Sequence, residues 1–572
     1  MASKHQTIPL GEYLFTRLKQ LNIGSIFGVP GDYNLRLLDY IKPTGIKWIG
    51  NCNELNAAYS ADAYSRIQGL SAVITTFGVG ELSAINGIAG AYAERAPVIH
   101  IVGAPARNVQ AARALVHHTF LDGEYGRFAE MHRHATAAQT RLTDVQTAAD
   151  RIDWIIEQAM IHQRPVYLQI PDDLVHMHVS TANFDKRPVI RPAPSTAEIS
   201  AETVDKILDL IYSATKPLLL VDGESRSIGA IEEINQLINT TGWPTWTTAF
   251  GKGLINEELP NVHGVYLADV GDEVSYDYFK SSDLILFFGP HMSNINTGIF
   301  KAIPEQSVTV SFSPGQINIA GKVIRDVDSR QYLQKIVSQF DSSRLAKIES
   351  PAIPSEAPSG PSPTDALNQA QFYHYVNSLF CRGDIVLTET GTAATGGKAF
   401  KLPQDCSYFT CVTWLSIGYM LPATLGAALA QRDMNDPKHS QRAVLFIGDG
   451  SLQMTAQEIS TMIKQKLNVI IFVINNNGYT IERAIHGRNA DYNDISPWNH
   501  QHALGLFGMS QDETSQRYFS AKTFAELKTA LESKVVQESD GVKMIEVFMG
   551  QEDCTGELKE LLERQMAREK PQ

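Results

Sequence analysis

Short apolar runs alternate with amphipathic, helix-like stretches along almost the whole of this 572-residue chain. The runs end at or near Gly, Asp or Asn, residues that favour a turn after a strand. Because short apolar runs followed by helices are typical of buried parallel strands, the pattern predicts an α/β fold built from βα units. The predicted strands lie at 24–32, 72–80, 97–105, 165–173, 217–223, 283–290, 443–451 and 468–477.

Two segments rich in Pro and Ser, 181–196 and 342–363, interrupt this alternation. Proline removes a backbone donor and fixes φ, so these segments suit extended linkers better than core elements. The chain is also longer than the ~250–300 residues at which single cores stop growing. We therefore expect three domains, each an open parallel sheet flanked by helices, at residues 1–185, 195–345 and 364–572, with a Pro/Ser linker at 346–363.

Charge and composition exclude several functions. The net charge is −13, with 49 Lys and Arg against 62 Asp and Glu, and no basic run is present that could neutralise a phosphate backbone, which argues against a nucleic-acid partner. The five cysteines are scattered without a CxxC pair, which indicates a reducing compartment and argues against zinc. No apolar run reaches the ~18 residues that a membrane span needs, and we expect a cytoplasmic protein with no membrane partner.

Polar groups follow the last two predicted strands. Gly448, Asp449 and Gly450 end one run, and Asn476 ends the other. The glycines let the backbone approach a ligand closely, and Asp449 offers a hard oxygen ligand. Mg²⁺ prefers octahedral oxygen coordination, so a carboxylate, an amide oxygen and a carbonyl would leave room for diphosphate oxygens and water. Each piece alone is more often a tight turn, but together they resemble the thiamine-diphosphate signature.

Acids and histidines suited to proton transfer occur in the first and last thirds of the chain. Glu54 begins a helix-like stretch of small neutral residues, where an inward carboxylate is costly without a partner; the alternative is an exposed charge at a helix N-terminus. Asp32, the adjacent pair His117 and His118, and Glu482 complete a set of acids and histidines suited to proton transfer near neutral pH. The histidine pair could bind a metal or lie in a loop without function, but no Cys or further His stands at ligand spacing, and we expect neighbouring side chains to point apart.

Taken together the motifs are specific for one family. The segments VPGDYN, NELNAAY, TTFGVGELSAINGIAGAYAE, HHT, ETGT, SIGY, GDGSLQ and NNNGYTIE resemble the pyruvate decarboxylase family, fungal members in particular, over nearly the whole chain. The resemblance implies thiamine diphosphate and Mg²⁺ as cofactors and thiamine-diphosphate-binding folds in the first and third domains. It also implies non-oxidative decarboxylation of a 2-oxo acid, either pyruvate or a longer aliphatic or aromatic analogue, to an aldehyde and CO2 through a thiamine ylid and enamine.

The resemblance assigns a role to each candidate residue. Glu54 would activate the cofactor, and Ile417 would wedge beneath it, although core packing is the alternative for an isoleucine. The expected metal ligands are Asp449, Asn476 and the carbonyl of Gly478, and the expected catalytic residues are Asp32, Glu54, His117, His118 and Glu482. The expected cofactor-binding residues are Glu54, Thr390, Thr392, Leu415, Ser416, Ile417, Asp449, Gly450, Ser451, Asn476, Asn477, Gly478, Tyr479, Thr480 and Ile481.

Three positions depart from the family. Leu415 stands where members usually carry Gly, but because the expected cofactor contact uses a backbone carbonyl, we expect function to survive. Ile295 and Thr395 stand where pyruvate-preferring relatives tend to carry Phe. Smaller walls enlarge a pocket, and each methylene contact changes substrate preference by ~1–3 kcal/mol. We therefore expect a substrate pocket of Asp32, His118, Ile295, Thr395 and Glu482 that accepts longer substrates.

Regulation and assembly follow from the same resemblance. Yeast-type relatives are activated at a cysteine of the middle domain, where this chain has Glu224 and Ser225, so we expect any sigmoidal kinetics not to involve a thiol. In the family each cofactor bridges two subunits, which makes a homodimer the minimum unit, commonly paired into a homotetramer. The last segment, TGELKELLERQMAREK, could close over the site or form an exposed amphipathic tail.

Two other functions stay open at this point. An acetohydroxyacid synthase-like carboligase, or a thiamine oxidase, shares the third-domain motif; it would often carry a flavin and would not be expected to show the HHT pair. A catalytically silent paralogue with a structural or regulatory role is the second alternative. The intact catalytic positions argue against it.

Overall fold

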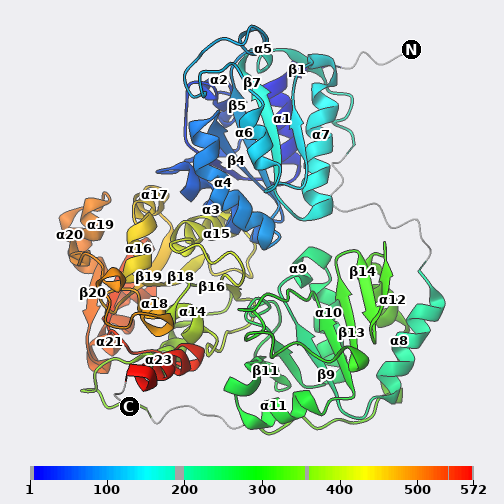
Figure 1. Ribbon diagram of the computed structural model, residues 1–572, viewed down its shortest axis with the longest axis vertical. Coiled ribbons are helices and arrows are strands. Elements are labelled where there is room, and N and C mark those ends of the chain that lie inside the picture. The colour runs from blue at the N-terminus through cyan, green and yellow to red at the C-terminus, as the bar shows by residue number, and fades with distance from the viewer. Residues whose placement is uncertain (1–5, 187–198, 354–359, 539, 570–572) are drawn as a thin grey trace. The chain divides into compact units, whose positions relative to one another are not determined.

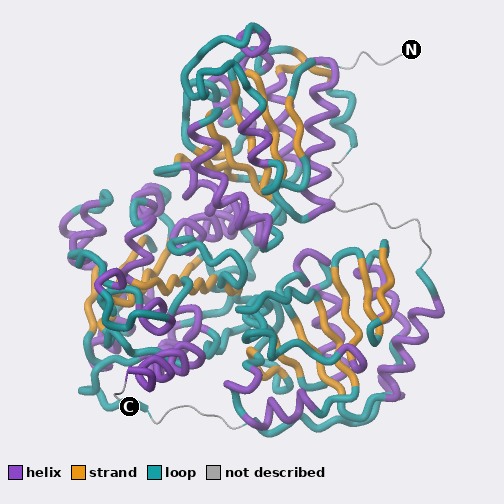
Figure 2. Tube along the Cα trace, viewed as in Figure 1, coloured by secondary structure: helices purple, strands orange, loops and turns teal. Residues whose placement is uncertain are grey.

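The structure, a computed structural model, describes residues 6–186, 199–353, 360–538 and 540–569 (Figure 1). Its strands form three large sheets of six, seven and six strands, each flanked by helices (Figure 2). The eight predicted strands are confirmed, as β2 (Ser25–Gly28), β4 (Ser71–Thr76), β5 (Val98–Ala104), β7 (Val166–Pro171), β9 (Pro217–Val221), β12 (Leu284–Phe288), β18 (Arg442–Gly448) and β19 (Asn468–Asn475). Parts of both predicted linkers, 187–198 and 354–359, lie outside the described residues.

The first sheet adds β3 (Lys47–Gly50) and β6 (Gln139–Arg141) in the order β3-β2-β4-β5-β7-β6. All five neighbouring pairs are parallel, as the sequence predicted. A separate antiparallel pair joins β1 (Thr7–Pro9) to β8 (His178–Ser180). The helices are α1 (Leu10–Gln20), α2 (Leu35–Leu38), α3 (Glu54–Gln68), α4 (Val79–Ala93), α5 (Arg107–Ala111), α6 (Arg127–His132) and α7 (Val145–His162).

The last sheet repeats this order. It adds β16 (Ile385–Thr388), β17 (Ser407–Phe409), β20 (Tyr518–Ala521) and β21 (Val542–Phe548) in the order β17-β16-β18-β19-β21-β20. In both sheets the chain first moves outward by one strand and then returns to the other side of its starting strand. The helices are α13 (Gln369–Tyr375), α14 (Thr392–Gly397), α15 (Met420–Met434), α16 (Asp449–Thr455), α17 (Glu458–Lys464), α18 (Thr480–Ile485), α19 (Ala503–Leu506), α20 (Gln511–Arg517), α21 (Phe524–Leu531), α22 (Lys534–Glu538) and α23 (Gly556–Glu569).

The middle sheet is only partly parallel, which differs from the prediction. Its order is β11-β10-β9-β12-β13-β14-β15, and β13, β14 and β15 are joined antiparallel. Two-residue turns, Pro314–Gly315 and Ala320–Gly321, connect these three strands, and such turns allow only antiparallel neighbours. The further strands are β10 (Thr245–Thr247), β11 (Val262–Val265), β13 (Thr309–Ser313), β14 (Gln316–Ile319) and β15 (Lys322–Arg325); the helices are α8 (Ala201–Ser213), α9 (Ser225–Ile228), α10 (Ile231–Thr241), α11 (Glu273–Lys280) and α12 (Ser329–Gln339).

The chain divides into two compact units, whose boundaries cross the sequence order. The first comprises Met1–Pro192, Tyr419–Pro437 and Thr455–Val469, and the second comprises Ala193–Gly418, Lys438–Met454 and Ile470–Gln572. Helices α15 and α17 therefore belong to the first unit, although they lie between strands of the last sheet in the sequence.

Helix α15 packs closely on α3. Ser60 Oγ donates to the Pro422 carbonyl at 2.9 Å, and the Tyr419 hydroxyl donates to Asp62 Oδ1 at 2.8 Å. A Cβ on Gly426 would lie 1.9 Å from the Ser60 carbonyl oxygen, so only glycine permits this approach. Within the part of the chain that the structure describes, every helix is too short or too polar to span a bilayer.

Candidate active site

A cavity of about 280 Å³ lies where β16, β18 and β19 end. Its walls come from the segments directly after these strands, at 390–393, 448–451 and 476–482. The strand order of the last sheet reverses beside β16, because β17 lies on one side of it and β18 on the other. In open parallel sheets ligands bind at the carboxyl ends of the strands next to such a reversal. The topology therefore marks this cavity as a ligand site.

Three oxygen-bearing groups meet in this cavity. In one orientation of the Asn476 amide, its oxygen lies 2.9 Å from the Gly478 carbonyl oxygen and 3.1 Å from Asp449 Oδ1; in the other, the NH2 group donates to both, and the oxygen accepts from Thr480 Oγ1 at 2.8 Å. The first orientation gathers a carboxylate, a carbonyl and an amide oxygen with no hydrogen among them. Such an oxygen set fits a divalent cation of the Mg²⁺ type.

The environment of Asp449 also suits a cation. Burial raises the pKa of this carboxyl to about 6, although the backbone N–H groups of Gly450 and Asn477 each donate to it at 2.8 Å. The charged form is disfavoured in a buried site unless a positive charge lies nearby. A bound divalent ion would supply that charge and hold the carboxylate ionised.

Most of the residues predicted to bind the cofactor lie together here. Leu415, Ser416 and Asn477 are not among the lining residues, and the predicted Glu54 belongs to the other compact unit. The predicted residues that line the cavity are Thr390, Thr392, Ile417, Asp449, Gly450, Ser451, Asn476, Gly478, Tyr479, Thr480, Ile481 and Glu482.

The segment that leads to Ile417 is held by the middle domain. His291 Nε2 lies 2.5 Å from Thr413 Oγ1, and Ser293 Oγ donates to the Val412 carbonyl at 2.5 Å. His291 Nδ1 in turn lies 3.0 Å from Glu224 Oε1. Glu224 stands where the family resemblance led us to look for a regulatory cysteine. Leu415 then has φ +53°, a left-handed conformation that favours glycine. That conformation gives a physical reason for the glycine expected at this position.

The C-terminal segment forms helix α23, which packs on α18, the helix that carries Glu482. Gln565 Nε2 donates to the carbonyls of Arg483 and Ala484 at 2.9 Å. Glu482 itself is exposed. The buried members of the apolar cluster between the two helices are Ala484, Cys554, Leu558 and Leu562.

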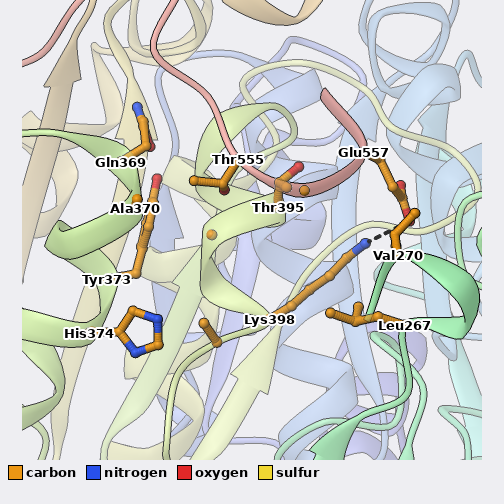
Figure 3. A pocket seen from close by; sticks show the side chains of 13 residues that line it. Leu267, Val270, Gln369, Ala370, Tyr373, His374, Thr395, Lys398, Thr555 and Glu557 are labelled. Carbon is orange, nitrogen blue, oxygen red and sulfur yellow. Dashed lines mark ion pairs between the residues drawn. The ribbon is translucent and has the colours of Figure 1, made fainter. Parts of the chain in front are cut away.

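A second cavity, of about 570 Å³, borders helix α14, which also contributes to the first cavity (Figure 3). Thr392 lines the first cavity and Thr395 lines the second. Ile295, which was predicted to share the substrate pocket with Thr395, is not among the residues that line either cavity. Figure 3 shows further lining side chains around Thr395, among them Leu267, Val270, Tyr373, Lys398, Thr555 and Glu557.

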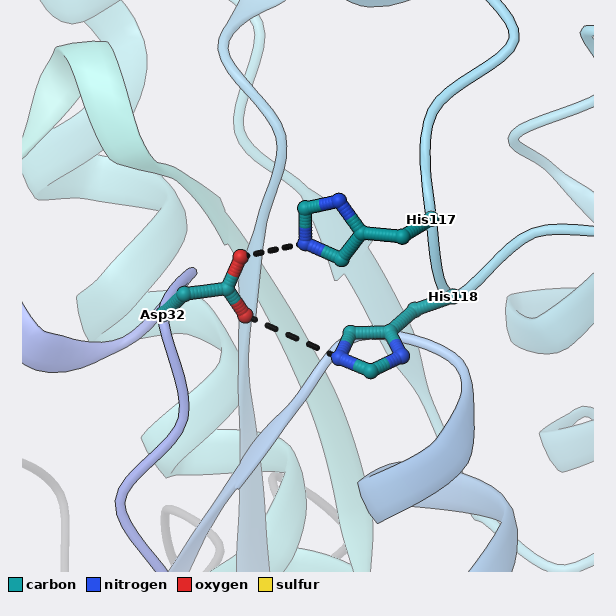
Figure 4. Close-up of side chains that lie close together, drawn as sticks. All are labelled: Asp32, His117 and His118. Atoms are coloured by element: carbon teal, nitrogen blue, oxygen red, sulfur yellow. Dashed lines mark hydrogen bonds and ion pairs between the residues drawn. The ribbon is translucent and has the colours of Figure 1, made fainter.

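In the first unit, the Asp32 carboxylate faces both His117 and His118 (Figure 4). His117 Nε2 is 2.5 Å from Asp32 Oδ2, and His118 Nε2 is 3.7 Å from Asp32 Oδ1. The Tyr33 ring stacks on His117 with centroids 5.0 Å apart. The expectation that the two histidines point apart was wrong. His118 has φ +60°, and this left-handed turn brings both rings to one carboxylate.

The three side chains of this cluster have the spacing of a metal site, since one ligand atom from each lies within 4.8 Å of the others. Asp32 and His117 are exposed, and exposed groups of this kind also serve proton transfer.

A buried network that the sequence analysis did not identify supports the histidine loop. A Cβ on Gly78 would lie 2.1 Å from the His118 carbonyl oxygen, so the two backbones touch. Glu81 accepts from the Gly78 N–H and from the Tyr167 hydroxyl, each at 2.8 Å, and burial raises its pKa to about 7. The only sequence signal was a single acid inside an apolar motif, TTFGVGEL.

Glu54 begins α3, and a buried acid, Glu458, binds the residues on either side of it. Glu458, on α17, accepts from the Cys52 N–H at 2.7 Å and from the side-chain amides of Asn51 and Asn56 at 3.2 and 3.1 Å. Glu54 itself is half-buried, and burial raises its pKa. Glu458 thus fixes residues on both sides of Glu54. The sequence analysis gave Glu458 no role, because its partners lie about 400 residues away.

Three family models match consecutive parts of the chain. The N-terminal, central and C-terminal domains of thiamine pyrophosphate enzymes match residues 8–124, 204–336 and 389–571. A pyruvate decarboxylase of Aspergillus parasiticus is 48% identical over 99% of both chains. The chain belongs to the pyruvate decarboxylase family of thiamine pyrophosphate enzymes.

More distant relatives agree with this family. Pyruvate decarboxylase isozyme 1 of Saccharomyces cerevisiae is 40% identical over 95% of each chain. A thiamine diphosphate-dependent 4-hydroxybenzoylformate decarboxylase of Rhodococcus jostii has the same fold, with a TM-score of 0.76, 18% identity, and coverage of 95% of this chain and 99% of that one. The predicted family and fold class are confirmed.

We predict that Glu458→Gln destabilises the protein. The glutamine NH2 would face N–H donors, and a buried donor left without an acceptor costs about 1–3 kcal/mol. The thermal denaturation midpoint of the variant should fall, whereas Glu532→Gln, at an exposed position, should leave it unchanged. An unchanged midpoint for Glu458→Gln would contradict the proposed role of this carboxylate.

Proposed function

We propose that this protein decarboxylates a 2-oxo acid without oxidation, giving an aldehyde and CO2 with thiamine diphosphate and Mg²⁺. The observation that carries the proposal is that oxygen atoms of Asp449, Asn476 and Gly478 lie together where the strand order of the last sheet reverses. The chain that places them there belongs to this family. Thiamine diphosphate, when bound, supplies the nucleophilic carbon and accepts the electron pair that CO2 leaves behind. The reaction makes the protein a carboxy-lyase.

Residues of the second unit would hold the cofactor. Asp449, the Asn476 amide oxygen and the Gly478 carbonyl would bind Mg²⁺. The N-terminus of α16 presents Gly450 and Ser451 to the diphosphate, where backbone N–H groups favour an anion. Ile417, in the cavity wall, would support the cofactor rings from one side.

The residues of the first unit would handle protons. Glu54 has a raised pKa, so it can hold a proton at its carboxyl and hydrogen-bond a ring nitrogen. Asp32 and His117 share a hydrogen bond, which lets the pair pass a proton to or from the reacting carbon, with His118 beside them. Glu482 would add a second acid from the other unit.

The side chain at position 395 bears on the size of the substrate. Thr395 lines the 570 Å³ cavity, and a bulkier side chain there would fill part of that space. We therefore propose that the enzyme accepts 2-oxo acids longer than pyruvate. Asp32, His118 and Glu482 would complete the substrate pocket.

Location and assembly are further proposals. The acidic composition and scattered cysteines support a cytoplasmic enzyme that binds a small molecule and no nucleic acid. We propose a homodimer as the minimum unit, paired into a homotetramer, with the first domain of one subunit facing the third domain of its partner. The proposed domain boundaries stay at 1–185, 195–345 and 364–572.

The function is tested by measuring aldehyde formation from pyruvate, 2-oxoisocaproate, phenylpyruvate and indolepyruvate, coupled to an alcohol dehydrogenase. Aldehyde should form only when both thiamine diphosphate and Mg²⁺ are present. A flavin-containing preparation that condenses two 2-oxo acids would favour the carboligase instead. No product from any of the four acids would favour a silent paralogue.

We predict that Glu54→Gln lowers kcat by at least about 100-fold, because the amide cannot move the proton that the carboxyl moves. The thermal denaturation midpoint should stay within a few degrees of the native protein, since Gln keeps the shape of Glu. The matched control is Glu130→Gln, an exposed acid of the same domain, which should keep full activity. Normal turnover by Glu54→Gln would remove Glu54 from the mechanism.

We predict that Thr395→Phe shifts specificity toward pyruvate. The ring would occupy the cavity beside α14, and the ratio of kcat/KM for indolepyruvate to that for pyruvate should fall by about 10-fold or more. Thr529→Phe, at an exposed threonine of α21, is the control and should leave the ratio unchanged. A native ratio in Thr395→Phe, or a native enzyme already selective for pyruvate over all three longer acids, would refute the enlarged pocket.

A further inference from the structure

A third cavity, of about 420 Å³, lies in the first unit, where β5, β6 and β7 end. It shares no residue with the cofactor cavity, which belongs to the other compact unit. Three guanidinium groups line it, from Arg107 after β5, from Arg113 after α5 and from Arg141 at the end of β6, against one carboxylate, Glu124. The lining is therefore positively charged in a protein whose net charge is −13.

The three arginines differ in how far their charge is already matched. Arg107 Nε lies 2.7 Å from Asp173 Oδ2, and Arg113 forms an ion pair with Glu124. Arg141 has no carboxylate within ion-pair distance among the described residues, and its Nη2 reaches only the Gln110 side-chain oxygen, at 3.5 Å. The Arg113–Glu124 pair is exposed to solvent and the Arg107–Asp173 pair is partly exposed, and ion pairs in such positions contribute little to stability. An incoming anion can therefore compete for all three groups.

We propose that this cavity binds a small phosphomonoester dianion. A phosphate ester has three terminal oxygens, which three guanidinium groups can contact at once, whereas a carboxylate has only two. Guanidinium groups form short, charge-assisted and often bidentate hydrogen bonds to phosphate. The cavity volume of about 420 Å³ leaves space for an organic group attached to the phosphate.

The site lies at the base of the loop that carries His117 and His118. Arg113 and Gly123 approach each other at the two ends of this loop, since a Cβ on Gly123 would lie 2.8 Å from the Arg113 Cβ. The Tyr125 hydroxyl donates to the Ala114 carbonyl at 2.6 Å and holds the two ends of the loop together. A ligand at Arg113 would thus contact the base of that loop directly.

The test is calorimetric titration of the full-length enzyme with glycerol 3-phosphate, at constant ionic strength and with thiamine diphosphate and Mg²⁺ saturating. Saturation with the cofactor keeps the probe out of the diphosphate site. Saturable binding is expected, with Arg141→Ala weakening it at least 10-fold. Arg141→Gln, which keeps more of the side-chain length, should weaken binding similarly and guards against misfolding of the alanine variant.

Two controls make the result specific. Arg133→Ala removes an exposed arginine of the same domain that pairs with Glu130 and does not line the cavity, so it should bind the probe as the native enzyme does. Acetate should bind at least 10-fold more weakly than inorganic phosphate or glycerol 3-phosphate. Absence of saturable binding, binding by both Arg141 variants as strong as that of the native enzyme, or binding of acetate as strong as that of phosphate would overturn the proposal. None of these outcomes depends on whether the enzyme decarboxylates a 2-oxo acid.

Discussion

The parallel hydrogen bonding of the first and last sheets is the constraint on which the candidate site depends. Because the strands run in one direction, the residues that follow them gather at a single edge. In the first sheet that edge receives Asp32 after β2 and Glu54 after β3. In the last sheet it receives Asp449 after β18 and Asn476 after β19. Residues far apart in the sequence thus come together without any special loop, and the same winding order produces both edges.

Buried carboxylates form a second layer beneath these edges. Glu458 and Glu81 are fully buried, yet each accepts hydrogen bonds from backbone N–H groups and from neighbouring side chains. Burial without such donors would cost several kcal/mol. The donors to Glu458 belong to the segment that carries Glu54, and Gly78, a donor to Glu81, contacts the His118 carbonyl. The hydrogen bonds that satisfy the buried carboxylates therefore also position the residues next to Glu54 and His118.

The sequence predicted the helices, the strands and the cofactor motif better than it predicted the residues that hold them in place. Asp449 and Asn476 were recognisable because each follows an apolar strand within one βαβ unit, a spacing that resembles the thiamine-diphosphate signature. The orientation of His117 and His118 was mispredicted, because alternation along a strand does not apply to a residue with positive φ. Glu458 was missed because its partners lie about 400 residues away, and local patterns contain no information on such a contact. The antiparallel edge of the middle sheet was missed although its Pro-Gly and Ala-Gly turns are visible in the sequence.

The placement of α15 and α17 in the first compact unit has a consequence for how the protein can be divided. The Pro/Ser segment before residue 364 looks like a natural place to cut, but a fragment that begins there would carry the α15 surface that packs on α3 without its partner. That surface includes Gly426, which in the fragment would be exposed to water instead of making its close contact with Ser60. The three sequence domains are thus not independent modules, because the first compact unit includes α15 and α17, which follow the middle domain in the sequence.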